Sequence, residues 1–130
     1  MKLIENYDGL LLDLDGVVYR GKQPIRDAIE TIGKLQSKMP IGYVTNNASR
    51  TQSQIADQLR GYGIELDPEQ VISSAMAGAE MLSEKVSGKV LVIGGEGLKE
   101  AVRKHGFEVV DSADDAPDAV IQGFSPDIGW

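Results

Sequence analysis

The hydrophobic positions of the chain follow two spacings in turn, and this predicts strands separated by helices. Short, nearly continuous apolar runs are typical of buried strands, and they occupy residues 9–14, 41–45, 71–72, 89–93, 107–110 and 119–121. Between these runs, apolar residues recur at every third or fourth position, which is the spacing of one helix face. The clearest set is Ile25, Ala28, Ile29, Ile32 and Leu35.

This alternation predicts the fold class. Strands joined by helices favour right-handed crossovers and a parallel sheet, so we predict an α/β fold with a Rossmann-like, mainly parallel sheet and helices on both faces. The first run, Gly9–Leu12 with Leu14, is continuously apolar, which predicts a strand that is buried on both faces. Ser87–Gly88 is a small, flexible pair between two strand–helix runs. It predicts a boundary between residues 1–87 and residues 88–130.

The charge and the residue types present exclude several classes of function. The 130 residues carry 20 acidic and 13 basic side chains, a net charge of −7. Such a surface repels polyphosphate backbones, so we expect no nucleic-acid partner. There is no cysteine, which excludes thiolate chemistry from these residues. No apolar run is long enough for a membrane span, and no signal-peptide core is present, so we expect a cytoplasmic protein without a membrane partner.

Two aspartates follow the first predicted strand and carry the strongest chemical signal. Asp13 and Asp15 lie where this strand ends, with Gly16 directly after them. Parallel sheets bind ligands beyond the carboxyl ends of their strands, and residues at i and i+2 of an extended chain point to the same side. One carboxylate could attack phosphorus while the other donates a proton to the leaving oxygen. Mg²⁺ would offset the negative charge, and the amide of Gly16 could contact an anion.

The motif alone leaves a solvated turn open as an alternative, because short motifs match often by chance. A calcium loop is excluded, since Val17 and Pro24 stand where oxygen ligands are needed. Thr45 favours the catalytic interpretation. It ends the second predicted strand, and its hydroxyl could bind a phosphoryl oxygen beside the amide groups of Asn46. Helix capping by Asn47 or Ser49 is the structural alternative for this segment.

The motifs together resemble one enzyme family. DLDGVVYRG at residues 13–21 and VTNNASR at residues 44–50 are similar to the haloacid dehalogenase superfamily, in its p-nitrophenylphosphatase or NagD-like branch. VISSAMAGAEML at residues 71–82 and KVLVIGGEGLKEAV at residues 89–102 resemble the same branch. The last segment, DAVIQGFSPDIGW at residues 118–130, is similar to glycerol-3-phosphate and phosphoglycolate phosphatases.

The resemblance implies a reaction and a set of site residues. It implies Mg²⁺-dependent hydrolysis of small phosphate monoesters through an aspartyl-phosphate, with Asp13 as nucleophile and Asp15 as general acid and base. Both aspartates would also be metal ligands. Residues 17–21 would form a flap over the site, and residues from about 88 onward would begin an inserted α/β cap. It further implies that Thr45 and Asn46 bind the transferring phosphoryl group. Leu14 and Gly16 are added as candidate phosphate-binding residues, and Asn47 and Arg50 as candidate substrate contacts, with a solvated surface arginine as an equal alternative for Arg50.

The family pattern also includes a lysine and a later acidic metal-binding motif, neither of which is found in these residues. We therefore expect residues 1–130 to be an incomplete and inactive part of the enzyme. Uncovered sheet edges would favour a homo-oligomer or a swapped dimer. Two other functions stay open from the residues. One is a phospho-accepting receiver-type domain, and the other is a nucleotide-binding module built on Gly94–Gly97, for which a plain strand–helix turn is the favoured interpretation.

Overall fold

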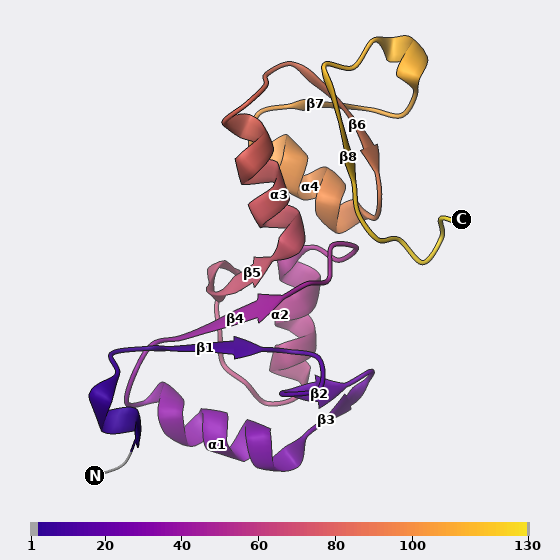
Figure 1. Cartoon of the computed structure of the whole chain (residues 1–130). Coiled ribbons are helices and arrows are strands. Elements are labelled where there is room, and N and C mark those ends of the chain that lie inside the picture. The colour runs from indigo at the N-terminus through magenta and orange to yellow at the C-terminus, as the bar shows by residue number, and fades with distance from the viewer. Residues whose placement is uncertain (1–2, 130) are drawn as a thin grey trace. The chain divides into compact units, whose positions relative to one another are not determined.

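The computed structural model describes residues 3–129, which form two compact units (Figure 1). Unit 1 contains the residues up to Thr45 and the segment Ser53–Ile72. Unit 2 contains Asn46–Gln52 and the residues from Ser73 onward. The predicted boundary at residues 87 and 88 lies inside unit 2, so the division into 1–87 and 88–130 does not follow the compact units and stays a prediction.

Unit 1 is built around a three-stranded sheet in the order β1–β4–β5. Strand β1 pairs in parallel with β4, so that Leu10 stands opposite Ile41 and Asp13 opposite Val44. A short antiparallel hairpin, β2 with β3, follows β1. The elements in chain order are η1 Leu3–Asn6, β1 Leu10–Asp13, β2 Tyr19–Arg20, β3 Gln23–Pro24, α1 Arg26–Gln36, β4 Ile41–Thr45, α2 Gln52–Gly61, η2 Pro68–Gln70 and β5 Val71–Ser73.

The core of unit 1 lies between its helices and strand β4. Apolar residues of α1 and α2 reach it at helical spacing, as the sequence predicted, and alternate residues of β4 face it. Its fully buried side chains include Leu14, Tyr43, Ile55, Leu59, Ile64 and Val71.

Strand β1 differs from its prediction, because it is not buried on both faces. Leu10 and Leu12 pack against the core, but Leu11 is 70% exposed. In the described sheet β1 is an edge strand with alternating inward and outward residues. Leu11 lies against Gly42 of β4. A Cβ added to Gly42 would lie 2.8 Å from the Cδ2 atom of Leu11. The apolar run predicted burial, but no described element covers this face.

Unit 2 has a second parallel sheet, in the order β7–β6–β8. The Ser73 hydroxyl caps helix α3 by accepting a hydrogen bond from the amide of Met76. The elements are α3 Ser74–Ser83, β6 Lys89–Ile93, α4 Glu96–Lys104, β7 Glu108–Val110, η3 Ala113–Asp115 and β8 Ala119–Gln122. Its core consists of Ala48, Ala75, Ala79, Val90, Val92, Leu98, Ala101, Val102 and Phe107. The prediction of an α/β fold with parallel sheets is confirmed.

Among residues 3–129, no helix combines the length and the apolar character that crossing a membrane requires.

Two leucine substitutions test which faces of unit 1 are covered. Leu59 of α2 is fully buried, so Leu59→Ala should lower the free energy of unfolding by about 2–5 kcal/mol through lost contacts and a cavity. Leu11→Ala removes the same atoms from a site that is exposed in the single chain, so in the monomer it should change the free energy of unfolding by less than about 0.5 kcal/mol. Urea titrations followed by circular dichroism measure both. Equal losses for the two variants would mean that the Leu11 face of β1 is covered in solution.

Candidate active site

The two candidate aspartates lie on either side of a fully buried leucine at the carboxyl end of β1. Asp13 is the last residue of the strand, and both Asp13 and Asp15 are exposed. Leu14 is 0% exposed and belongs to the core of unit 1. Because Leu14 is directed into the core, the two carboxylates are both left facing solvent. One oxygen of Asp13, Oδ1, accepts a hydrogen bond of 2.8 Å from the amide of Leu14.

A tight turn follows Asp15 and fixes the chain there. The carbonyl oxygen of Leu14 accepts hydrogen bonds from the amides of Val17, Val18 and Tyr19, at 3.2, 2.8 and 3.2 Å. The amide of Gly16 donates to the carbonyl of Tyr19 at 2.7 Å. Gly16 has a φ of 82°, which is a left-handed conformation that favours glycine.

The amides predicted to contact phosphate therefore have protein partners in this structure. The Leu14 amide donates a hydrogen bond to Oδ1 of Asp13, and the Gly16 amide donates one to the carbonyl of Tyr19. An anion would have to displace these acceptors, and for Gly16 this means rearranging the turn. Their role as phosphate ligands stays a prediction.

Thr45 lies at the carboxyl end of β4, the strand beside β1. Val44 is the register partner of Asp13, and Thr45 is the next residue along β4. The side chain of Thr45 is 5% exposed. Because parallel strands end at the same edge of a sheet, unit 1 carries Asp13, Asp15 and Thr45 at one edge.

The residues predicted to form a flap lie in and just before the β2–β3 hairpin, which is tied to helix α2. The Tyr62 hydroxyl donates a hydrogen bond of 3.0 Å to the carbonyl of Lys22 and accepts one of 2.6 Å from Gln58 Nε2. The rings of Tyr19 and Tyr62 lie 6.0 Å apart at an angle of 54°. The sequence analysis did not identify Tyr62 or Gln58. Neither residue belongs to a motif, and the contact joins segments 40 positions apart.

The other candidate residues, Asn46, Asn47 and Arg50, belong to a loop of unit 2. Asn47 Oδ1 accepts hydrogen bonds from the Ser49 amide at 2.9 Å, the Ser49 hydroxyl at 2.9 Å and the Arg50 amide at 3.3 Å. These bonds close a turn within the loop, because Ser49 and Arg50 precede the first residue of α2, Gln52. The side chain of Asn46 is exposed and that of Arg50 is half-buried.

The donor atoms at the end of β1 suit Mg²⁺ in kind. Asp13 and Asp15 supply carboxylate oxygens and the adjoining backbone supplies carbonyl oxygens, which are the hard ligands that this ion prefers. Mg²⁺ is commonly held by one or two carboxylates together with water and substrate phosphate, so two carboxylates are sufficient in number. Within the described part of the chain, no cluster of three or more His, Cys, Asp or Glu residues could hold a metal.

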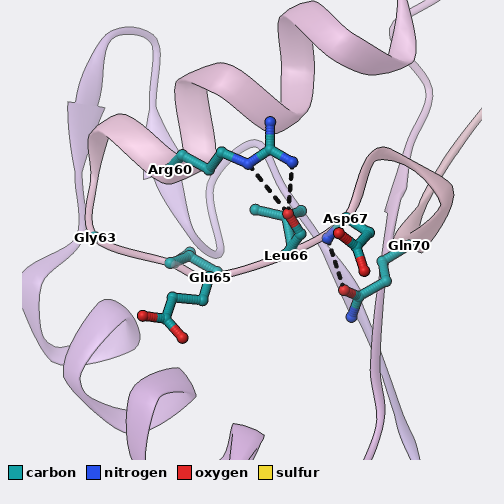
Figure 2. A pocket seen from close by; sticks show the side chains of 7 residues that line it. Arg60, Gly63, Glu65, Leu66, Asp67 and Gln70 are labelled. Carbon is teal, nitrogen blue, oxygen red and sulfur yellow. Dashed lines mark hydrogen bonds between the residues drawn. The ribbon is translucent and has the colours of Figure 1, made fainter.

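A cavity of about 700 Å³ lies elsewhere in unit 1, beside the C-terminal end of α2 (Figure 2). Polar side chains that line this cavity form hydrogen bonds with the backbone of the surrounding loop. Arg60 donates from Nε and Nη2 to the carbonyl of Leu66, at 3.1 and 2.8 Å. Gln70 accepts from the amide of Asp67 at 2.9 Å and donates to the carbonyl of Ile41 at 2.7 Å. These contacts hold the 63–70 backbone in place, and we assign the cavity a structural role.

Comparison with known proteins identifies relatives for nearly the whole chain. The family model described as haloacid dehalogenase-like hydrolase matches residues 10–108. The D-glycerol 3-phosphate phosphatase of Mycobacterium tuberculosis is 36% identical over 130 residues, which is 98% of this chain and 36% of that protein. An acid sugar phosphatase of Staphylococcus haemolyticus is 36% identical over 98% of this chain and 48% of its own length.

Solved structures give the same result. The glycerol phosphate phosphatase of M. tuberculosis in complex with magnesium matches with a TM-score of 0.87 and 38% identity, over 95% of this chain and 37% of that one. The p-nitrophenyl phosphatase of Archaeoglobus fulgidus matches with a TM-score of 0.82 and 30% identity, over 95% and 47% of the two chains. The chain thus spans less than half the length of these proteins.

Tyr62→Phe tests how the hairpin is held. The substitution keeps the ring contact with Tyr19 but removes the hydroxyl that joins Lys22 and Gln58, so the free energy of unfolding should fall by roughly 1 kcal/mol. Amide hydrogen exchange in residues 19–24 should also become faster. Tyr7→Phe is the matched control, since Tyr7 is 61% exposed and should alter neither measurement. Unchanged exchange in the Tyr62 variant would show that the hydroxyl does not restrain the hairpin.

Proposed function

The chain belongs to the haloacid dehalogenase-like hydrolases, and from this premise we propose that it supplies the nucleophile of an Mg²⁺-dependent phosphatase. The substrates are small phosphate monoesters, and the reaction passes through an aspartyl-phosphate. The observation that carries this proposal is the edge of the unit 1 sheet, where Asp13 and Asp15 flank a buried leucine and Thr45 ends the adjoining parallel strand.

The chemistry divides between the two aspartates. An oxygen of Asp13 attacks phosphorus and the bond from phosphorus to the substrate oxygen breaks, while Asp15 gives its proton to the departing alkoxide. Asp15 then takes a proton from water, which attacks phosphorus, releases phosphate and restores the Asp13 carboxylate. Asp13 suits nucleophilic attack because it ends the strand and its carboxylate is exposed. Asp15 lies two residues further on, at the start of the turn, so its carboxylate can reach the leaving oxygen while Asp13 attacks phosphorus.

The remaining candidate residues bind and orient the phosphoryl group. The Thr45 hydroxyl and the Asn46 amide groups donate to its oxygens, as would the backbone amides of Leu14 and Gly16 once their present acceptors are displaced. Asn47 and Arg50 contact the rest of the substrate. Mg²⁺, held by Asp13 and Asp15, supplies positive charge where several negative groups meet.

The substrate class is supported by what the relatives' names share. They are a glycerol phosphate phosphatase, acid sugar phosphatases and a 5'-nucleotidase, all of which are named for small phosphate esters. The net charge of −7 disfavours polynucleotides as substrates. Glycerol phosphate and phosphoglycolate are the esters to test first. A location in the cytoplasm, away from membranes, is part of the same proposal.

Asp13→Asn tests the nucleophile in a longer, active chain that contains residues 1–130, because these residues alone are expected to have little activity. The change is nearly isosteric, so the protein should fold normally while phosphate release from glycerol 3-phosphate in the presence of Mg²⁺ falls to background. Rapid acid quench and mass spectrometry should find phosphate on Asp13 in the unsubstituted protein. Asp8→Asn, a change at another exposed aspartate, is the control and should keep full activity. Phosphate trapped on Asp15 would reverse the two roles, and a phosphoprotein that never releases phosphate would favour a receiver-type domain.

Residues 1–130 alone should hydrolyse these esters slowly or not at all. Two carboxylates and a phosphate dianion repel each other, by about 4 kcal/mol for each pair of unit charges at 4 Å and an effective dielectric of 20. The lysine that the family pattern places after the cap, which would offset this charge, is not found among residues 1–130. The open edge of β1 beside exposed Leu11 should also promote a homo-oligomer or a swapped dimer.

The measurement compares residues 1–130 with a longer chain that also carries the lysine and the later acidic motif of the family pattern. Phosphate release with and without Mg²⁺ gives the activity of each, and light scattering gives the size of the shorter one. A monomeric 1–130 chain with full activity would contradict this expectation.

A further inference from the structure

The Gly94–Gly97 turn has a partner that the sequence did not suggest. It joins β6 to α4, and from the sequence it was either a phosphate cradle or a plain turn. In the structure the amide of Gly97, in the first turn of α4, donates a hydrogen bond of 3.0 Å to the carbonyl of Ser49. A backbone oxygen therefore occupies the position that an anion would take at this helix end. The turn is packed against the loop that carries Asn46, Asn47 and Arg50.

The two segments approach too closely for a side chain at Gly95 or at Gly97. A Cβ on Gly97 would lie 2.1 Å from the carbonyl oxygen of Arg50, 2.4 Å from its carbonyl carbon and 2.7 Å from its nitrogen. A Cβ on Gly95 would lie 2.7 Å from both Cα and the carbonyl oxygen of Ser49. These neighbours are mostly backbone atoms, which cannot rotate aside as the end of a flexible side chain can. Only glycine at both positions allows the loop to lie where it does.

Other contacts fix the rest of the loop on the same unit. The Ser74 hydroxyl donates a hydrogen bond of 2.8 Å to the carbonyl of Asn46. Ala48 is buried in the core of unit 2, and its Cβ would lie 3.2 Å from a Cβ on Gly123. The loop is thus held at Asn46, Ala48, Ser49 and Arg50.

We infer that Gly95 and Gly97 are positioning residues for the phosphate- and substrate-binding loop 46–50. This inference rests on the proposed function for the ligand roles of Asn46 and Arg50. The glycines touch no substrate. They set the backbone from which the Asn46 amide and the Arg50 guanidinium project, so that these donors are ordered before the phosphate arrives. Ordering donors in advance lowers the entropy that binding must remove.

Three variants of the 130-residue chain separate this role from simple packing. Gly97→Ala forces the loop away from α4, although alanine itself favours helix. Ser74→Ala removes the hydrogen bond from the Ser74 hydroxyl to the Asn46 carbonyl without adding a clash. It is the variant to measure if Gly97→Ala fails to fold. Gly33→Ala is the matched control, because Gly33 lies in helix α1 with no atom within 4 Å of an added Cβ.

Two measurements are made on each variant. The first is amide hydrogen exchange at Ser49 and Arg50, whose amides bond to Asn47, compared with β6. The second is calorimetric titration with inorganic phosphate in the presence of Mg²⁺. Destabilisation that leaves more than half of the molecules folded would lower the apparent affinity by less than about twofold. Loss of ordered charged donors should weaken it by about tenfold or more.

We expect Gly97→Ala to raise the Kd for phosphate about tenfold and to speed exchange at Ser49 and Arg50 while β6 keeps its protection. Ser74→Ala should change both in the same direction by less, and Gly33→Ala should change neither. An unaltered Kd, or exchange that rises equally in β6, would overturn the inference. If the unsubstituted chain binds no phosphate but Gly97→Ala still frees the two amides, the ligand roles of Asn46 and Arg50 fail for residues 1–130 and the positioning of the loop is supported.

Discussion

The carbonyl oxygen of Leu14 accepts hydrogen bonds from three successive amides, while the side chain of the same residue is wholly buried. These two constraints act at one position and determine the geometry of unit 1 beyond β1. Burial of the side chain directs the neighbouring carboxylates to solvent, and the carbonyl folds the following residues into a turn. The hairpin then begins close to Asp15, and Tyr62 anchors it to α2. A polar residue in place of Leu14 would disturb all of these features together.

Local periodicity was sufficient to predict much of the fold. The spacing of Ile25, Ile29 and Ile32 defines one face of a helix, and the structure has α1 at Arg26–Gln36. The apolar run of β1 was misinterpreted for a physical reason. An apolar run indicates that a strand favours burial, but it does not identify the element that covers each face. The exposed side chain of Leu11 is covered by no described element.

Some features of the candidate site were likewise predicted from the sequence and others were not. Asp13, Asp15 and Thr45 were predicted from residue type and strand-end position, and the pairing of β1 with β4 places these strand ends side by side. The contacts of Tyr62 with Lys22 and of Gly97 with Ser49 were not predicted, because each joins segments about 40 or more positions apart. A glycine-rich turn after a strand has many uses. The backbone that packs against the Gly94–Gly97 turn shows which use applies, because the turn contacts the 46–50 loop and a backbone carbonyl accepts the Gly97 amide.

The contact between α4 and the 46–50 loop also bears on how such enzymes diverge. Around a Cβ at Gly97 the nearest atoms are the nitrogen, carbon and oxygen of the Arg50 main chain, so the close approach at Gly97 is to the backbone of residue 50. Replacing the side chain at position 50 would keep the backbone atoms that Gly97 approaches. Under the proposed function, in which residue 50 contacts the substrate, single substitutions there could change the preferred ester while this backbone contact is kept. The relatives named for glycerol, sugar and nucleoside phosphates show the range of chemistry that such tolerance would allow selection to explore.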